Sequence, residues 1–429
     1  MLPLILAVLA ALALLVGQHR TTVHGGRPTS HPTAETPASA DVAAVMDVLS
    51  HHARALTSRQ AAAWADDLDS SAAATGYAGR QRQVFDNLAQ VPLSAWRYVL
   101  SAPVTNPDVI EPAAARLHAQ VVILHVQLQY AFTAVDPAPT SKQLWLTAVH
   151  RGAGWKLAGD DDATALGGPS WRGPWDFGPL VALAGPHTLV LAHPAHRADE
   201  RLFGALVEKS VPVVTSVWGP RWNDHVAVLI PNTAAEFTAV AGDLTDSAEL
   251  AAVAVADQVD PDGTVLGARI VLNPTNLARL DPAGRRLVVQ HELTHVASRA
   301  GTSDQMPTWL IEGFAEYVGN LHSGLPVTVS AAELSADVRA ARLPTMLPTS
   351  AAFQSGPRSE QAYEGSWLAC RLIAHRAGQA GLVRFYKVVS AAAETDPATA
   401  AAAGLRTVLG TDNAAFTAAW RDYLVSELT

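Results

Sequence analysis

The residues of this chain best suited to chemistry stand together in His291-Glu292-Leu293-Thr294-His295. On a helix, side chains four residues apart lie on one face, so both imidazoles can bind the same Zn²⁺ ion. Glu292, one position round the helix, is placed to hold a water on that metal and to take its proton. The spacing predicts a hydrolytic zinc site with His291 and His295 as ligands and Glu292 as general base. The alternative is a surface helix that carries these three residues without a metal.

The residues downstream argue against that alternative. A catalytic zinc needs a third protein ligand and an open position for water. The chain continues with Pro307-Thr-Trp-Leu-Ile-Glu312-Gly-Phe-Ala-Glu316-Tyr317, and Trp-Leu-x-Glu-Gly-x-Ala-Glu-Tyr after His-Glu-x-x-His resembles the gluzincin metallopeptidases, the thermolysin and aminopeptidase N superfamily. The resemblance implies that Glu312 is the third ligand of one Zn²⁺ ion per chain. The metzincin pattern does not fit, because it needs Gly and His where this chain has Ser298 and Gly301.

Glu316 lies four residues past Glu312 and therefore on the same helical face. A carboxylate that accepts the free N–H of a ligating histidine commonly supports a zinc site, and we predict this role for Glu316. The alternatives are an ordinary solvated carboxylate and an exchange of roles between the two glutamates. Sixteen residues lie between His295 and Glu312, so the connecting loop must be short.

A third segment, Gln361 to Leu368, opens an apolar helical run that ends near Gly378. Its Tyr363-Glu364-Gly365 resembles the Tyr-Glu-x-Gly motif of aminopeptidase-like gluzincins, with one residue fewer before the glycine. The resemblance implies that Tyr363 donates a hydrogen bond to the oxyanion, a donor that the chemistry requires. The alternative is a tyrosine that packs at the start of a helix. The Gly-x-Met-Glu-Asn motif that binds a free amino terminus is missing, which argues against a standard aminopeptidase.

Composition sets wider limits on the chain. Its 429 residues indicate two or three domains, and 49% hydrophobic with 16% charged residues suffices for buried cores. The net charge of −9 argues against binding to nucleic acid, which requires a basic surface. Cys370 is the single cysteine, which excludes an intramolecular disulfide and predicts a buried structural thiol. Zinc ligation must therefore use histidine and carboxylate.

The amino terminus predicts a membrane segment. Leu2 to Gly17 is uncharged, so residues 1–20 are interpreted as a signal anchor or a cleaved signal peptide. Arg20 follows the run, and the positive-inside rule alone would place the remainder in the cytoplasm. Residues 21–40, rich in Thr, Pro, His and Ala, predict a disordered linker that resembles a stalk. We therefore expect a membrane-anchored protein with its catalytic part outside the cytoplasm, or a secreted one if the segment is cleaved.

Residues 41–165 predict a small helix-plus-antiparallel-sheet domain. A helical pattern over Val42 to Asp69 precedes strand-like runs, which are Ala95 to Leu100, Leu117 to Phe132, Gln143 to Val149 and Trp155 to Leu157, the last two joined by a turn at Arg151 to Gly154. Helices followed by a curved sheet resemble the cone of the nuclear transport factor 2-like fold. We find no convergent acid, base and oxyanion set here, so the domain is interpreted as a spacer or recognition module.

Residues 175–429 predict the metallopeptidase-like domain, with a mixed sheet before a mostly helical carboxyl-terminal part. We expect a helix at Arg201 to Lys209 and an edge strand at Val211 to Val217, because Pro212 cannot donate to a sheet. Further strands are expected at Leu189 to His193, His225 to Ile230, Ala251 to Val255 and Ala268 to Leu272. The histidine helix should begin near Asp281-Pro282, and Ala268 to Asn273 should be the edge that pairs with an extended substrate.

The sequence thus predicts an α+β protein with an amino-terminal membrane helix. Its expected function is a membrane-tethered zinc peptidase, with Glu292 and Tyr363 as catalytic residues and peptide or protein substrates. A second hypothesis is a catalytically silent, zinc-stabilised module that presents the cone domain to a cell-surface partner. No feature of the sequence indicates an oligomeric state.

Overall fold

The computed structural model describes residues 37–152, 154–242, 250–354, 356, 358–393 and 396–429. The chain is α+β, and its described residues form two compact units: residues 37–182 with 193–195, and residues 183–192 with 196–429. The predicted membrane segment and most of the predicted linker lie outside the described residues. Within the described ranges, no helix is long and apolar enough to cross a bilayer.

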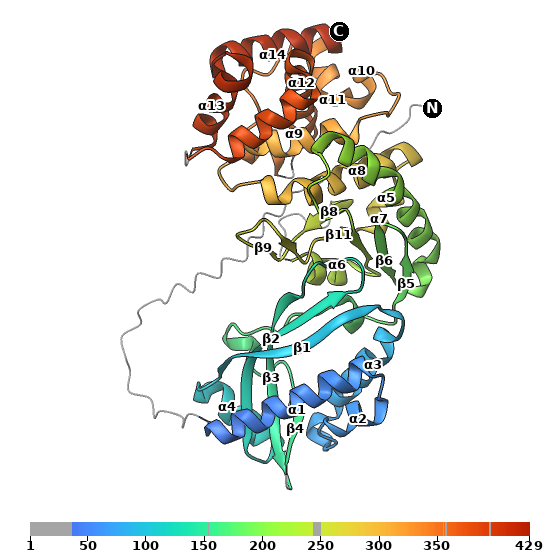
Figure 1. Cartoon of the computed structure of the whole chain (residues 1–429), viewed down its shortest axis with the longest axis vertical. Coiled ribbons are helices and arrows are strands. Elements are labelled where there is room, and N and C mark those ends of the chain that lie inside the picture. The colour runs from blue at the N-terminus through green and yellow to red at the C-terminus, as the bar shows by residue number, and fades with distance from the viewer. Residues whose placement is uncertain (1–36, 153, 243–249, 355, 357, 394–395) are drawn as a thin grey trace. The chain divides into compact units, whose positions relative to one another are not determined.

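The first unit packs helices against an antiparallel sheet of order β1-β2-β3-β4 (Figure 1). The helices are α1 (Ser39–Thr57), α2 (Ala61–Asp66), α3 (Thr75–Asn87) and α4 (Pro107–Leu117), with single turns η1 (Ala72–Ala74), η2 (Leu88–Gln90), η3 (Thr164–Leu166) and η4 (Pro174–Asp176). The strands are β1 (Leu93–Pro103), β2 (Val121–Phe132), β3 (Thr140–Arg151) and β4 (Gly154–Gly159). Helix α1 lies against β1, β2 and β4, as the predicted helix-plus-sheet arrangement requires.

Two boundaries in this unit differ from the sequence prediction. The predicted strand from Leu117 is wrong over its first residues, because Leu117 is the last residue of α4, His118 caps that helix with a left-handed φ of 51°, and β2 begins only at Val121. Asn106 caps the start of that helix by accepting a hydrogen bond from the Asp108 N–H. The predicted linker also ends earlier than expected, since α1 begins at Ser39.

The second unit contains a five-stranded mixed sheet of order β5-β6-β7-β11-β8. Its strands are β5 (Val181–Ala184), β6 (Thr188–Ala192), β7 (Val226–Ile230), β8 (Ala252–Val255) and β11 (Arg269–Leu272), and the separate hairpin consists of β9 (Gln258–Val259) and β10 (Val265–Leu266). Strands β6, β7 and β11 run parallel to one another, whereas β8 pairs antiparallel with β11. The sheet is mixed, as predicted.

The helices of the second unit include those that carry the site. They are α5 (Arg197–Trp218), α6 (Ala234–Ala241), α7 (Pro274–Leu277), α8 (Pro282–Ser298), α9 (Thr308–Gly319), α10 (Val327–Ser330), α11 (Ala332–Arg339), α12 (Ser359–Ser390), α13 (Pro397–Leu409) and α14 (Asn413–Leu428), with turns η5 (Pro194–His196), η6 (Arg299–Gly301) and η7 (Ser350–Phe353). Helix α8 contacts β8, β11, α5 and α9, and the later helices gather beyond it (Figure 1). The mostly helical carboxyl-terminal part is confirmed, and the expected end at Gly378 is a kink inside α12.

The predicted edge strand at Val211 to Val217 is wrong, because these residues belong to the single 22-residue helix α5. Val211, Val214 and Val217 repeat at helical spacing and are buried. Pro212 lies exposed on the opposite side of the helix. Apolar burial of this face outweighs the cost of a proline inside a helix, which is about 3 kcal/mol.

The predicted substrate edge is also misplaced by one strand. Strand β11, within the predicted range Ala268 to Asn273, lies between β7 and β8 and has a partner on both sides. The edge beside the histidine helix is therefore β8. Long-range pairing decides strand order, and the local apolar pattern of the two strands does not distinguish them.

Helix α8 begins as predicted, and its first turn explains why. The Asp281 side chain accepts a hydrogen bond from the Gly284 N–H at 2.7 Å, and Pro282 occupies the first helical position. The last eleven residues of the helix, 288–298, are all buried. This helix therefore holds its histidines inside the protein and not on a solvated surface.

A close approach between α9 and α12 explains the glycine that follows Glu312. A Cβ atom on Gly313 would lie 2.3 Å from the carbonyl oxygen of Ser366 and 3.0 Å from Cys370 Sγ. No larger residue fits unless the two helices separate. The glycine therefore sets the distance at which α12 packs behind the helix that carries Glu312.

We predict that Gly313→Ala destabilises the second unit by about 1–3 kcal/mol, the usual cost of an overpacked core. Gly79→Ala is the control, since nothing lies within 4 Å of its Cβ position on α3 and alanine favours a helix. Thermal unfolding monitored by circular dichroism measures both. Equal melting temperatures for the two variants would contradict the packing role of Gly313.

Candidate metal centre

Two helices bring the predicted ligands together. Helix α8 carries His291 and His295 one turn apart, and α9 packs against α8 with Glu312 in its second turn. All three side chains are buried, with exposed fractions of 0%, 5% and 1% in that order. The single turn η6 and the short loop to Pro307 connect the helices, which agrees with the predicted short connection.

The three ligand atoms form a compact triangle. His291 Nε2 lies 3.0 Å from His295 Nε2 and 3.4 Å from Glu312 Oε2, and His295 Nε2 lies 3.6 Å from the same oxygen. Ligands at 2.0–2.1 Å from a tetrahedral zinc are roughly 3.3–3.4 Å apart. The triangle therefore has the size that one Zn²⁺ ion requires, and these residues are one of the groups in the described chain whose ligand atoms converge.

The hydrogen bonding of the triangle also fits a cation. Neither carboxylate oxygen of Glu312 accepts a hydrogen bond, although both are buried. A buried carboxylate without hydrogen bonds is costly unless a cation neutralises it. Two imidazoles with one carboxylate are a ligand set that zinc takes in catalytic sites, with a fourth position left for water. The residues present therefore fit the metal that the sequence predicts.

Neighbouring charges shift the pKa values of two members of the triangle, Glu312 and His291. Burial alone would raise the pKa of Glu312, but the imidazoles of His295 and His291 lower it to about 2. For His291 the directions are reversed: burial alone would lower its pKa, but the contacts with Glu312 and Glu316 raise that pKa well above the usual value. The protein therefore keeps positive charge beside an ionised carboxylate, an environment that a divalent cation can occupy in place of protons.

Glu316 lies behind His291, on the side away from the triangle. Its Oε1 is 3.1 Å from His291 Nδ1, whereas His291 Nε2 points to the other ligands. The second oxygen of Glu316 accepts a hydrogen bond from Asn320 Nδ2 at 3.1 Å. This chain of contacts orients the ring of His291 and supports the predicted division of roles between the two glutamates.

Glu292 points toward strand β8. Its Oε2 accepts a hydrogen bond from the Ala254 N–H at 2.7 Å, and its Oε1 is buried without a hydrogen-bond partner. Burial raises the pKa of this carboxyl group, against the lowering effect of His291 and His295. A base whose pKa moves toward neutrality transfers protons more effectively near pH 7. One oxygen is thus held by the backbone and the other is free to accept a proton.

Tyr363 is buried near the start of α12. Its ring meets Phe353 edge-on, with centroids 5.1 Å apart. Burial raises the pKa of this phenol well above its usual value, and the nearby carboxylates of Glu312, Glu316 and Glu292 add to the rise. The hydroxyl therefore stays protonated and lies within electrostatic range of the three site glutamates.

Glu364, the next residue, has a structural function. Its Oε2 accepts a hydrogen bond from the Leu334 N–H at 2.6 Å, and its Oε1 accepts one from the Glu333 N–H at 3.3 Å. Both N–H groups belong to the first turn of α11, where donors lack partners within the helix. Of the motif Tyr363-Glu364-Gly365, only the tyrosine is thus near the triangle.

The structure brings every sequence-predicted site residue into one region of the second unit, and it adds two that the sequence analysis missed. Asn320, which holds Glu316, continues the spacing of Glu312 and Glu316 by a further four residues and was detectable on that ground. The Ala254 N–H could not be predicted from the sequence, because every residue type except proline has a backbone N–H group.

The solved structures that are similar to this chain include zinc metallopeptidases, at low identity and low TM-score. An M1 zinc metallopeptidase from Deinococcus radiodurans is 18% identical over 64% of this chain and 58% of its own, with a TM-score of 0.36. A mutant of an M1 zinc metallopeptidase from the same organism is 13% identical over 70% of this chain and 90% of its own, with a TM-score of 0.37. Yeast LTA4 hydrolase is 15% identical over 64% of this chain and 43% of its own, with a TM-score of 0.36.

The chain spans only 58% of the length of the two-domain M1 metallopeptidase mutant that it also matches. No protein-family model matches the sequence, and neither does any curated protein.

Proposed function

We propose that this chain is a zinc-dependent peptidase with the site centred on His291, His295 and Glu312. The observation that carries the proposal is the buried triangle of their three ligand atoms. Beside it lies the carboxylate of Glu292, of which one oxygen accepts a hydrogen bond and the other has no partner. Zinc bound there would lower the pKa of a water to about 7 and polarise a substrate carbonyl group. A fourth protein ligand in place of the water would instead indicate a purely structural metal.

The residues of the chain supply the other steps. Glu292 accepts the proton of the attacking water at Oε1, while the Ala254 N–H keeps Oε2 in place. Glu292 then passes that proton to the leaving amine, because a carboxyl group with a raised pKa can act first as base and then as acid. Tyr363 donates a hydrogen bond to the carbonyl oxygen as negative charge develops on it.

Strand β8 is the surface on which we expect an extended peptide to bind. Among the described residues it pairs with β11 along one edge only, and its Ala254 N–H on the other edge meets Glu292. A free strand edge captures a peptide backbone by main-chain hydrogen bonds, independent of side-chain sequence. The general base would then lie directly beside the bound substrate.

The proposal is tested by digesting a peptide library with the purified full-length chain. We expect cleavage that a zinc chelator stops and that added zinc restores. A folded, zinc-loaded chain that cleaves neither the library nor an unstructured protein would favour the silent binding module instead.

Tyr363→Phe isolates the proposed oxyanion donor. We predict a loss of about 100-fold in kcat, the lower end of the effect of removing such a donor, with zinc affinity unchanged. Tyr317→Phe is the matched control, because burial raises the pKa of Tyr317 and the charges that add to this shift are those of Cys370 and Arg371, not those of the site glutamates. Steady-state kinetics of both variants on one peptide decide the matter. Equal kcat values would show that Tyr363 is not the oxyanion donor.

We also propose that the catalytic unit lies outside the cytoplasm, tethered or secreted through residues 1–20. The support is the uncharged run from Leu2 to Gly17 and the stalk-like composition that follows it. Protease treatment of intact cells should remove the unit. Complete protection until the cells are lysed would favour a cytoplasmic location.

A further inference from the structure

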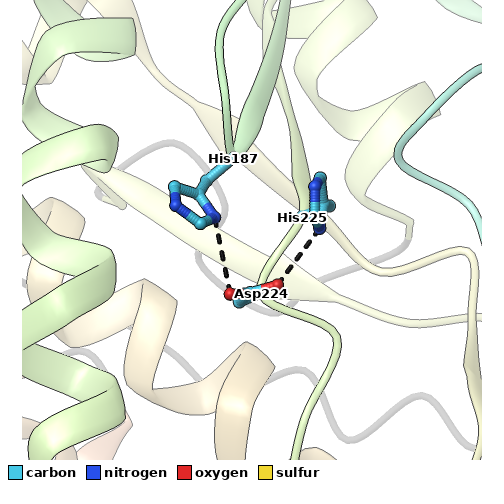
Figure 2. A group of neighbouring side chains, drawn as sticks. All are labelled: His187, Asp224 and His225. Atoms are coloured by element: carbon cyan, nitrogen blue, oxygen red, sulfur yellow. Dashed lines mark ion pairs between the residues drawn. The ribbon is translucent and has the colours of Figure 1, made fainter. Parts of the chain in front are cut away.

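Two histidines and an aspartate converge at a second place in the same unit. His187 immediately precedes β6, and His225 immediately precedes β7. These strands are parallel neighbours with Thr188 opposite Val226, so their register places the two histidines side by side. Asp224 lies between the rings, as Figure 2 shows. The cluster comes from two segments, the residue before β6 and the two residues before β7, whose strands are paired in register.

The distances within this cluster have the size of a metal site. Asp224 Oδ2 lies 3.4 Å from His187 Nδ1, and Asp224 Oδ1 lies 3.1 Å from His225 Nδ1. The ring centroids of the histidines are 5.5 Å apart, and one ligand atom from each residue lies within 4.8 Å of the others. Ligands of a tetrahedral zinc are roughly 3.3–3.4 Å apart, close to both histidine–aspartate distances.

The state of His187 favours a metal over a simple ion pair. Its Nδ1 is buried but has no hydrogen-bond partner, although the Asp224 carboxylate lies beside it. A buried ring nitrogen without a partner is costly, and a bound cation would satisfy it. The three side chains remain 34–40% exposed, which gives an ion access and leaves room for water to complete four-coordination.

The backbone around the cluster is held rigidly. The His187 N–H donates to Glu208 Oε1 at 2.9 Å, which ties this turn to α5. The His187 carbonyl oxygen accepts a hydrogen bond from the Val226 N–H, also at 2.9 Å. The two histidines are therefore positioned before any ion binds, and less conformational entropy is lost on binding.

We propose that His187, Asp224 and His225 form a second Zn²⁺ site, which shares no residue with the triangle on α8 and α9. Imidazole nitrogens with one carboxylate suit zinc, whereas Ca²⁺ and Mg²⁺ prefer all-oxygen sets. The ion would join the turn between β5 and β6 to the loop between α5 and β7. Its role is to stabilise the amino-terminal ends of the two central strands, independent of peptidase activity.

The test is a zinc titration of the metal-free full-length chain. Wild type should bind two zinc ions, and Glu312→Ala should still bind one through the second site. In the Glu312→Ala background, both His225→Gln and Asp224→Asn should weaken that remaining ion by at least about 100-fold, more than the loss of a supporting hydrogen bond usually costs. His196→Gln is the control, because His196 faces Asp199 at 3.0 Å and belongs to no three-residue ligand group within the described part of the chain.

A second readout separates this site from peptidase function. Zinc should raise the melting temperature of Glu312→Ala, and His225→Gln should abolish that rise. In a chain with Glu312 intact, His225→Gln should leave kcat unchanged. A single zinc ion in wild type, or unchanged affinity of Glu312→Ala after His225→Gln, would overturn the second site and leave the triangle untouched.

Discussion

Replacing Glu312 with alanine is expected to abolish tight zinc binding at the triangle and, with it, peptide hydrolysis. The variant leaves two imidazoles where a catalytic zinc takes three protein ligands. We expect at least about a 100-fold loss of affinity, beyond what removal of a mere supporting contact costs. Glu312→Gln should behave similarly, because it keeps the side-chain volume but replaces the charged ligand with an amide.

Glu316→Gln is the matched comparison for Glu312. It removes the carboxylate beside His291 Nδ1 but leaves all three ligand atoms in place. Loss of such a contact usually costs about 10–100-fold in affinity or activity. Zinc titration of the metal-free variants, with activity measured on one peptide, distinguishes the two roles. If Glu316→Gln loses zinc and Glu312→Ala merely weakens it, the assignment of the glutamates is reversed.

Glu292→Gln is expected to keep zinc while losing at least about 100-fold in kcat, because removal of a general base costs 100- to 10,000-fold. Glutamine cannot accept the proton of the attacking water. Its amide oxygen can still accept the hydrogen bond from the Ala254 N–H, so the fold around β8 should be preserved. The loss therefore reports chemistry and not misfolding.

The measurement is kcat for Glu292→Gln at saturating zinc, with bound zinc determined in the same samples. Glu111→Gln is the control for folding, because it makes the same substitution at an exposed position of α4, in the other unit. A Glu292→Gln variant that hydrolyses peptide at the wild-type rate would show that another group is the base.

The ligands were predictable because helical geometry relates their positions in a simple way. His291 and His295 share one face of α8 by spacing alone, and the resemblance of the following segment pointed to Glu312. Even the first residue of α8 followed from the cap at Asp281. Local rules decide these features, and no knowledge of the strand order was needed.

The substrate edge could not be predicted from local patterns. Strands β8 and β11 are both short, apolar and buried, and only their pairing shows which one has a free edge. The contact between the Ala254 N–H and Glu292 depends on the same pairing. Residues that are distant in the sequence determine both features, so no pattern within the segment Ala252–Val255 predicts either of them.

The second histidine cluster shows the same dependence on register. His187 and His225 are separated by a whole helix, and only the parallel pairing of β6 with β7 makes them neighbours. Pro212 is the opposite case, because a local rule predicted an edge strand where the structure has a helix. The rule disfavours proline within helices, but burial of one valine face decides the structure of α5.

The most direct test of the account is the position of zinc in a crystal of the full-length chain loaded with the metal, located by anomalous scattering at the zinc edge. We predict a peak about 2.0–2.2 Å from His291 Nε2, His295 Nε2 and one oxygen of Glu312, with a fourth position taken by water. The absence of zinc from the triangle, or a peak ligated by Glu316 in place of Glu312, would contradict the central claim.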